Sequence, residues 1–434
     1  MPRAALPGTA LPRTASARPA PGRTRPTTRR PVSQALIVPP ELRIADGAGA
    51  SVFRAAAHRG PVPRDTIAEI TGLSVATVNR QVSALIAAGL LRERPDLVEP
   101  GAVGRPRVPV EADHERYLTI GIHIGAVTTG IVASDIRGRI IGAVGIPTPN
   151  GDQSIALSSI TASARAFSSR WHRRTPLWAG VALGGRVDSV TGIVDHVRLG
   201  WKGAPVGAVI GGGLGLPVSV AAHVESMAAA ELLLAPDRDA AEATGTSLYF
   251  YARETTGIAI TFDGKVHTPA GGPGSVSHLP TGSSAACPCG GTGCLEATVS
   301  DQAVVQRARA AGLFDASDAT RRAPTIQALY KVAHDGSRPA RELLVERAEV
   351  LGRTVAMLRD LFNPDRVVLG GQAFTEYPAG VPHVAQAFAR ASTLPRKDVR
   401  ISGFGNRVQA HAAGAVSLAS LYADPLGAVR RART

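Results

Sequence analysis

The residues whose types and spacing best predict chemistry are the three cysteines of the chain, Cys287, Cys289 and Cys294, with His278 upstream of them. Three thiolates and one imidazole supply the four sulfur and nitrogen ligands that a structural zinc ion prefers in tetrahedral geometry. The glycines between the cysteines let the backbone turn sharply enough for a Cys-x-Cys pair to hold one ion. The alternatives are three reduced cysteines in a glycine-rich loop, or one disulfide with an unpaired thiol. The clustering favours zinc, and the scarcity of cysteine argues against a secreted disulfide framework.

This stretch, His278-x8-Cys287-x-Cys289-Gly-x-x-Gly-Cys294-Leu-Glu296, resembles the zinc motif of the ROK family. That family groups bacterial sugar kinases with sugar-responsive transcription repressors. In it the histidine both ligates zinc and touches the sugar, and the glutamate that ends the motif reaches a sugar hydroxyl. The resemblance therefore implies a structural zinc on His278 and the three cysteines, and an effector site that includes His278 and Glu296.

The composition allows several domains and sets limits on the location. A chain of 434 residues with 44% hydrophobic residues is long enough for two or three domains with real cores. No run of eighteen apolar residues and no hydrophobic signal segment occurs, so we expect a cytoplasmic protein, associated with the nucleoid if it binds DNA. The formal net charge of +14 decides little by itself, because the distribution of charge matters more than its total.

Residues 1–45 are rich in Pro, Arg, Ala and Thr and show no apolar periodicity, which predicts a disordered tail. Its arginines could hold DNA phosphates non-specifically. The other interpretation is an unselected linker, or a start codon placed too far upstream.

Residues 46–113 are predicted to form a winged helix-turn-helix domain. Apolar residues at helical spacing predict one helix around Val52–Ala56, a second from Asp65 to Ile70, and a third after Ser74. Gly72 suits the end of the second helix and Ser74 the N-cap of the third. The segment Arg92–Val110 reads as a β-wing, and its Gly-Arg-Pro run resembles the wing of ROK-type repressors.

The third helix suits the recognition helix of such a domain, placed in the major groove, while wing arginines suit a narrow minor groove. Nine basic and nine acidic residues lie between residues 41 and 113, so DNA binding rests on placement of charge; the alternative is a generic three-helix protein-interaction module. The predicted DNA-binding residues are Ser74, Val75, Thr77, Asn79, Arg80, Gln81, Arg105 and Arg107, with Arg92 and Arg94 on the same face.

Residues 114–424 are predicted to form two α/β lobes with a cleft between them. Apolar runs at 118–124, 130–134 and 139–146 predict an antiparallel meander, and strands and helices alternate after it. The resemblance names this architecture as the two-lobed actin-like ATPase fold that sugar kinases share. Residues 425–434 are expected to be a frayed basic tail.

The family resemblance also exposes departures from the kinase pattern. His223 stands where the kinases have the aspartate that activates the sugar hydroxyl, and His123 and Ala126 alter the first phosphate loop. Arg198 replaces a sugar-contacting asparagine, and Ser275 replaces a sugar-binding carboxylate. Phosphoryl transfer depends on positioned metal, backbone donors and a base. We therefore predict no catalytic residues and no kinase activity.

These observations favour a sequence-specific transcriptional regulator, most simply a repressor of carbohydrate-related genes. A homodimer or tetramer would read an inverted repeat, and a sugar or sugar phosphate bound by His223, His278, Glu296 and Arg198 would modulate DNA affinity. Two alternatives stay open: a ROK sugar kinase with an accessory DNA-binding domain, and a DNA-binding protein that responds to no effector.

Overall fold

The computed structural model describes residues 36–98, 107–235, 244–269, 272, 274–314, 323–395 and 398–433. These residues all belong to the structural unit Gln34–Thr434. The arginine-rich segment before residue 36 and the wing residues 99–106, among them Arg105, lie outside the described residues.

Short helices and two paired strands form the N-terminal domain, residues 46–113. They are α1 (Ala48–Arg59), α2 (Arg64–Thr71), α3 (Val75–Ala87), β1 (Leu91–Glu93), η1 (Pro95–Leu97) and β2 (Val110–Ala112). Gly72 ends α2 with a left-handed φ of 65°, where glycine is favoured, and Ser74 caps α3 by accepting a hydrogen bond from the Thr77 N–H at 3.2 Å. Val78, Val82 and Leu85 of α3 are fully buried, and β1 pairs with β2 antiparallel. The three predicted helices are therefore present, and β1 pairs with β2 at the two ends of the segment predicted as a wing.

Residues 36–45, which the sequence pattern assigned to a disordered tail, lie against two sheets instead. The Val38 N–H donates to the Val218 carbonyl at 2.9 Å, and the Ile44 N–H donates to the Gly264 carbonyl at 2.8 Å. Leu42 and Ala45 are each 3% exposed. The prediction was wrong for this segment because backbone pairing with open sheet edges gives no periodic signal in so short a stretch. We call residues 36–45 the strap.

Lobe 1 is built on sheet 1, five strands in the order β10-β6-β3-β4-β5. They are β3 (Tyr117–Ile124), β4 (Thr128–Asp135), β5 (Ile140–Pro147), β6 (Thr175–Leu183) and β10 (Val218–Ala222). β3, β4 and β5 form the predicted antiparallel meander, while β6 runs parallel to β3 and to β10. A smaller sheet of β7 (Arg186–Asp188), β8 (Ile193–His196) and β9 (Trp201–Ala204) follows, and η3 (Val197–Leu199) links its last two strands.

Side chains of β3 point alternately to the two faces of sheet 1, and each face is covered by different helices. Leu118, Ile120 and Ile122 pack in one cluster with α4 (Gln153–Ser168), which ends in η2 (Ser169–Trp171), and with α5 (Val206–Leu214). The intervening residues face α14 (Val408–Ala423): the Thr119 hydroxyl lies 2.7 Å from the Ser417 hydroxyl. At Gly121 an added Cβ would lie 2.6 Å from the Ala413 carbonyl carbon, so glycine permits the close approach of α14.

Lobe 2 is built on sheet 2, in the order β13-β12-β11-β14-β15. The strands are β11 (Thr246–Ala252), β12 (Thr256–Phe262), β13 (Lys265–Val266), β14 (Arg366–Gly370) and β15 (Asp398–Ile401). The helical elements of this lobe are α7 (Leu295–Val299), α8 (Asp301–Ala310), α10 (Ile326–His334), α11 (Arg338–Phe362), α12 (Gln372–Thr375), η5 (Pro378–Gly380) and α13 (Val381–Ala391). Leu351 and Val355 of α11 pack against Leu248 and Phe250 of the central strand β11.

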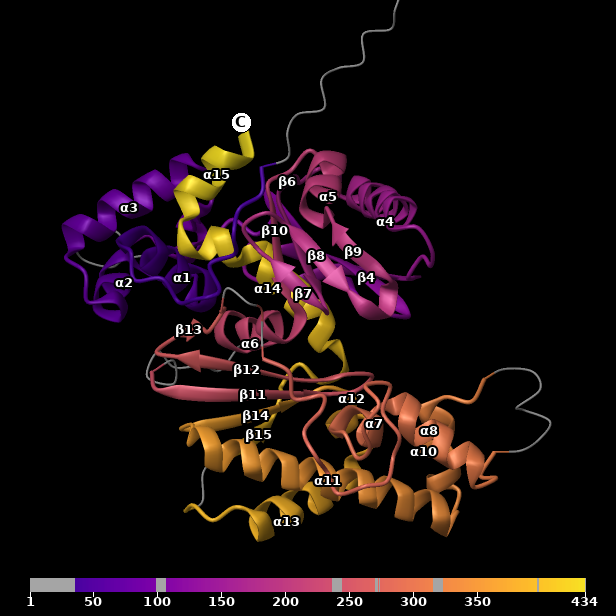
Figure 1. The fold of residues 1–434 in the computed structure, drawn as a ribbon. Helices are drawn as coiled ribbons and strands as arrows, with labels where there is room; N and C mark the ends of the chain where they lie inside the picture. The colour runs from indigo at the N-terminus through magenta and orange to yellow at the C-terminus, as the bar shows by residue number, and fades with distance from the viewer. Residues whose placement is uncertain are drawn as a thin grey trace, which may run out of the picture. The chain divides into compact units, whose positions relative to one another are not determined.

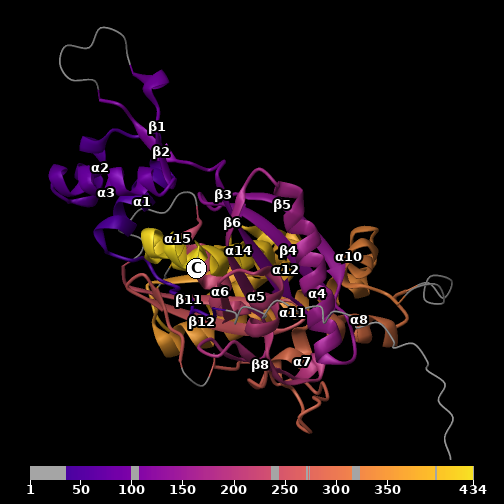
Figure 2. The same ribbon diagram turned by 90° about the horizontal axis from the view of Figure 1, so that it is seen from above.

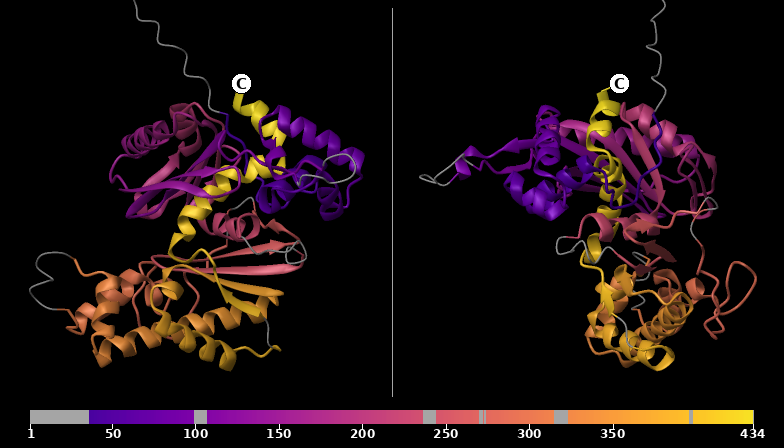
Figure 3. Two further views of the ribbon diagram at one scale, coloured as in Figure 1. Left: turned by 180° about the vertical axis from the view of Figure 1, so that it is seen from behind. Right: turned by 90° about the vertical axis from the view of Figure 1, so that its left-hand side faces the viewer.

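Two helices lie between the sheets. α6 (His223–Leu233) packs on β11 and β12 of sheet 2, and α14, which η6 (Gly405–Arg407) precedes, packs on sheet 1 and on α6. Figure 1 shows α6 directly above β12, and the view from behind shows α14 running from lobe 2 toward the N-terminal domain (Figure 3). The two-lobed α/β fold expected from the sequence is confirmed.

The C-terminal segment, expected to be a frayed basic tail, is helix α15 (Pro425–Arg433). Ala428 and Val429 are buried, and the Arg433 guanidinium donates to the Tyr117 hydroxyl at 3.3 Å. The helix forms because its apolar residues pack against α1, α3 and β6, and Arg431 also lies over the Trp178 ring, 5.8 Å from its centroid. Seen from above, α15 lies beside the indigo helices (Figure 2).

Within the described residues no single helix is long and apolar enough to cross a membrane. Gly405–Ala423 and α15 meet that criterion only as a pair, and the pair is bent by 105°.

Candidate functional site

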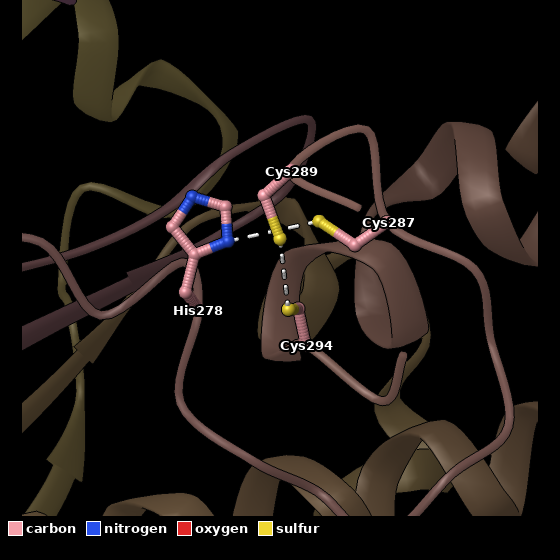
Figure 4. Close-up of side chains that lie close together, drawn as sticks. All are labelled: His278, Cys287, Cys289 and Cys294. Atoms are coloured by element: carbon pink, nitrogen blue, oxygen red, sulfur yellow. Dashed lines mark hydrogen bonds between the residues drawn. The ribbon is translucent and has the colours of Figure 1, made fainter. Parts of the chain in front are cut away.

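His278 and the three cysteines converge at the loop that leads into α7 (Figure 4). Their ligand atoms all lie within 4.8 Å of one another, which makes this a cluster that could hold a metal ion. The Cys287 sulfur is 3.6 Å from Nδ1 of His278, and the Cys289 and Cys294 sulfurs are 3.7 Å apart. None of the three cysteines forms a disulfide. The four residues that the sequence predicted as ligands are therefore brought together.

The distances fit a tetrahedral ion. Zinc–sulfur bonds of about 2.3 Å in tetrahedral geometry separate two sulfurs by about 3.8 Å, close to the separation of Cys289 and Cys294. Burial raises the pKa of the Cys294 thiol to about 11, so this sulfur needs a cation beside it to ionise at neutral pH. Four converging ligands with a buried thiol among them suit a closed structural site.

The backbone around the ligands depends on one glycine in particular. Gly293 has a φ of 70°, and a Cβ there would lie 2.5 Å from the Ser283 carbonyl oxygen. Gly293 also accepts hydrogen bonds from the Thr281 N–H and hydroxyl, at 2.8 and 2.9 Å. This turn places Cys294 at the N-cap of α7, two residues before Glu296, so the candidate ligands and Glu296 lie at one junction.

Glu296 and Arg198 meet across the two lobes. The Arg198 guanidinium donates to Oε1 of Glu296 at 2.8 Å, while Oε2 accepts from the Thr256 N–H and the Ser277 hydroxyl, both at 3.1 Å. Arg198 lies on η3 of lobe 1, and Glu296 lies on α7 of lobe 2. Two of the four predicted effector residues are thus in direct contact.

His223 lies apart from this contact, beside His123. Their rings stack with centroids 6.0 Å apart, and the Tyr251 ring lies 5.4 Å from His223. Burial lowers the pKa of His123 to about 3 and that of His223 to about 4, so both imidazoles are neutral at pH 7. Nε2 of His123 is buried without a hydrogen-bond partner among the described residues.

The predicted effector residues therefore occupy three places: the metal cluster, the Arg198–Glu296 contact and the histidine pair. No described hydrogen bond or ion pair joins His223 to Arg198, Glu296 or His278. A bound ligand that touched all of them would have to bridge these places itself.

The predicted DNA-binding residues at the start of α3 and along it differ in their solvent exposure and in the contacts they already make. Ser74 is engaged as the N-cap, and Gln81 lies back toward α1, within 3.2 Å of the Cβ position of Gly49. Val75 is 53% exposed, Thr77 is partly exposed, and Asn79 and Arg80 are exposed. Arg80 makes no ion pair with any described residue. Asn79 and Arg80 are the side chains best placed to contact a ligand on this face.

The wing arginines that the structure describes, Arg92, Arg94 and Arg107, are paired with acidic residues. Glu111, 3% exposed, accepts from Arg92 at 2.8 Å and from Arg94 at 3.0 Å. Burial opposes ionisation of Glu111, but these hydrogen bonds outweigh it and lower the pKa of the carboxyl. Arg107 pairs with Asp65 at 2.9 Å and is 79% exposed. The predicted positive face thus carries its own counter-charges.

Arg64 and Glu111 are the residues of this face that sequence reasoning missed. Arg64 donates to Glu93 of β1 at 2.7 Å and, more weakly, to Oδ1 of Asn79 at 3.4 Å, so it links β1 and α3. The only available signal was that an arginine follows Pro63 at the start of a predicted helix. Glu111 gave no signal, because its partners are 17 and 19 residues away.

A family model described as "ROK family" matches residues 119–421, most of the chain. "Transcriptional regulator Rv0485" of Mycobacterium tuberculosis is 56% identical over 403 residues, covering 92% of this chain and 91% of that protein. The "DNA-binding transcriptional dual regulator NagC" of Escherichia coli strain K12 is 25% identical over 334 residues, covering 74% of this chain and 80% of that protein.

Among solved structures, a ROK family transcriptional regulator that is a homologue of the E. coli Mlc protein superposes with a TM-score of 0.71. The match covers 88% of this chain and 98% of that one at 24% identity, so it supports the fold alone.

Proposed function

The chain belongs to the ROK family, and from that premise we propose that it is a DNA-binding transcriptional regulator that reads an inverted repeat as a dimer or tetramer. The observation that carries the proposal is the exposed face of α3, where Asn79 and Arg80 lie beside a paired wing. Helix-turn-helix proteins place such a face in the major groove, where arginine favours guanine and asparagine favours adenine. The naming of its relatives as transcriptional regulators supports the same function.

The experiment is genome-wide capture of DNA bound by the tagged wild-type protein, an Arg80→Ala variant and an Arg309→Ala variant. Arg309 is an exposed arginine on α8 of lobe 2, so its removal changes the net charge equally without touching α3. We expect a small set of sites that share an inverted repeat, lost with Arg80→Ala and kept with Arg309→Ala. Diffuse enrichment in all three samples would contradict a sequence-specific regulator.

We propose zinc as the ion of the His278 and cysteine cluster. Three sulfur ligands and one imidazole suit zinc better than hard cations, which prefer oxygen. The ion would be structural, since four protein ligands leave no open position for substrate. It would fix the loop that carries Glu296 to the start of α7.

The cleft is proposed to bind a sugar or sugar phosphate without phosphorylating it. Glu296 and Arg198 offer a carboxylate and a guanidinium at the lobe boundary, and neutral His223 stands where a kinase of this family carries its aspartate base. A test is calorimetric titration with glucose, N-acetylglucosamine and their 6-phosphates, beside an ATP-turnover assay of wild type and His223→Asp. Turnover by the wild type would favour the kinase alternative, whereas turnover by His223→Asp alone would identify His223 as the residue that prevents it. Operator affinity unchanged by every sugar would favour an effector-independent regulator.

A further inference from the structure

The strap joins lobe 1 at its first residues. Ile37 pairs with Val218 as a parallel bridge, which extends sheet 1 beyond its edge strand β10. The Val38 N–H donates to the Val218 carbonyl and the Val218 N–H donates to the Leu36 carbonyl, both at 2.9 Å. The Ser219 hydroxyl adds a third hydrogen bond, to the Val38 carbonyl at 2.7 Å. The start of the strap is therefore part of sheet 1.

A few residues later the strap joins lobe 2. Arg43 pairs antiparallel with Lys265 on β13, the edge strand of sheet 2. The Val266 N–H donates to the Leu42 carbonyl at 2.9 Å, and the Ile44 N–H donates to the Gly264 carbonyl at 2.8 Å. Leu42 is 3% exposed and belongs to the same apolar cluster as Val266. The same short segment therefore extends the edges of both sheets.

The strap then leads directly into α1. The Ala45 carbonyl accepts from Arg54 of α1 at 2.8 Å, and α1 begins at Ala48. The body of α1 rests on lobe 1, where Arg137 donates to the Ala57 carbonyl at 3.3 Å and the Phe53 ring lies 5.9 Å from that of Tyr422. The start of α1 is thus tied to lobe 2 while its body lies on lobe 1. In Figure 1 the indigo segment descends from sheet 1 to α1.

We propose that the strap transmits a change in the angle between the two lobes to α1, and so to the placement of α3 on DNA. This inference rests on the proposed function and names the device by which the cleft would regulate DNA binding. Between its two anchors the strap has only Pro39, Pro40 and Glu41. Proline fixes φ and a residue spans at most about 3.6 Å, so these three residues form a short and conformationally restricted link between the anchors. Relative movement of the lobes therefore displaces the start of α1 from its seat on α14.

The test breaks the ion pair between the lobes and measures the effect on the stability of α1. Hydrogen–deuterium exchange of residues 48–59 would be compared in wild type, Arg198→Met, Ile44→Pro and the double variant. Arg198→Met breaks one ion pair between the lobes, and Ile44→Pro removes the backbone donor that anchors the strap to Gly264. Ile44→Ala is the matched control, because it also shortens the side chain but keeps the N–H.

We expect Arg198→Met to speed exchange in α1 by up to about fivefold, the scale that loss of one partly exposed ion pair gives. In the Ile44→Pro background the same change should add nothing further, whereas in Ile44→Ala it should act as in wild type. Independent effects of Arg198→Met and Ile44→Pro would overturn the proposal, because distant sites that are not coupled add. An exchange rate in α1 that Arg198→Met leaves unchanged would overturn the proposal as well.

A second measurement separates this inference from the function on which it rests. Coupling is reciprocal, so operator DNA bound to wild type should slow exchange in residues 256–266 of lobe 2, and Ile44→Pro should abolish that protection. If the wild type retained no specific DNA at all, the proposed function would fail, and the DNA-free comparison would still decide the strap. Specific binding without protection at 256–266 would overturn the strap alone.

Discussion

Arg198 and Glu296 connect the two lobes through one ion pair, with Nη2 of Arg198 2.8 Å from Oε1 of Glu296. The side chains are 35% and 22% exposed, so solvent screens much of their attraction. The ion pair therefore holds the two lobes together only weakly and contributes little to the stability of the fold. Its carboxylate is also held by Thr256 and Ser277, so breaking the pair leaves Glu296 in place.

For this pair we predict a coupling energy of about 0.2–1 kcal/mol in a double-mutant cycle of Arg198→Met and Glu296→Gln. Both substitutions keep the approximate size of the side chain and remove its charge. The free energy of unfolding, measured by urea denaturation at low and high salt, gives the coupling, which should shrink at high salt. Strictly additive variants would show that the two groups do not interact in solution.

For the metal cluster we predict one zinc per chain by elemental analysis of the purified protein, and its loss in Cys289→Ser. Thermal unfolding of that variant should occur several degrees lower, because the four-ligand site holds the loop that leads into α7. Ser284→Ala is the matched control, since Ser284 is exposed in the same loop and makes no described hydrogen bond. A metal content that Cys289→Ser leaves unchanged would contradict the site.

For the histidine pair we predict a loss of stability in acid. The folded pKa values of about 3 for His123 and about 4 for His223 lie below the unfolded value of 6.5, so the unfolded chain binds more protons. Stability is therefore full above pH 6.5 and falls as the pH drops, by about 1.4 kcal/mol per pH unit for each histidine, until each folded pKa is reached.

The measurement is urea denaturation between pH 7.5 and 5 for wild type and a His123→Gln, His223→Gln double variant. The wild type should lose stability more steeply than the variant as the pH falls. His334, 90% exposed on α10, provides the control as His334→Gln. If the free energy of unfolding fell equally steeply with pH in wild type and the double variant, the pKa values of His123 and His223 would not differ between the folded and unfolded states.

The sequence predicted the elements that have a periodic apolar pattern and the cluster that is built from rare residues. Helical spacing placed α3, alternating and apolar runs placed β3 to β5, and the cysteine spacing gave all four members of the metal cluster. These features are local, so a short window of sequence contains the whole signal.

What the sequence could not predict depends on contacts between distant segments. The strap pairs residue 37 with 218 and residue 43 with 265, and no local pattern reports such pairing. The His123–His223 stack likewise exists only because β3 and the start of α6 meet in the folded chain. Arg92 and Arg94 were expected on the DNA-binding face, and nothing in the sequence indicated that Glu111 on the neighbouring strand neutralises part of their charge.

Glu111 gives the last prediction, because it clamps two arginines of the wing from a buried position. Glu111→Gln keeps the size of the side chain but leaves Arg92 and Arg94 without their shared counter-charge. The wing then gains one positive charge, so affinity for non-specific duplex DNA should rise and its salt dependence should steepen by about one unit of slope. Fluorescence anisotropy over a series of 50 to 200 mM salt measures both quantities.

The same substitution should weaken discrimination between operator and non-specific DNA, because the buried clamp also fixes β1 against β2. Glu115→Gln is the control: Glu115 is 66% exposed and meets Arg92 only at 3.4 Å, so it removes the same charge without releasing the wing. A gain in salt slope for both variants with specificity unchanged would mean that the Glu111 clamp acts through net charge alone. A loss of specificity confined to Glu111→Gln would mean that wing geometry, held by this carboxylate, contributes to operator recognition.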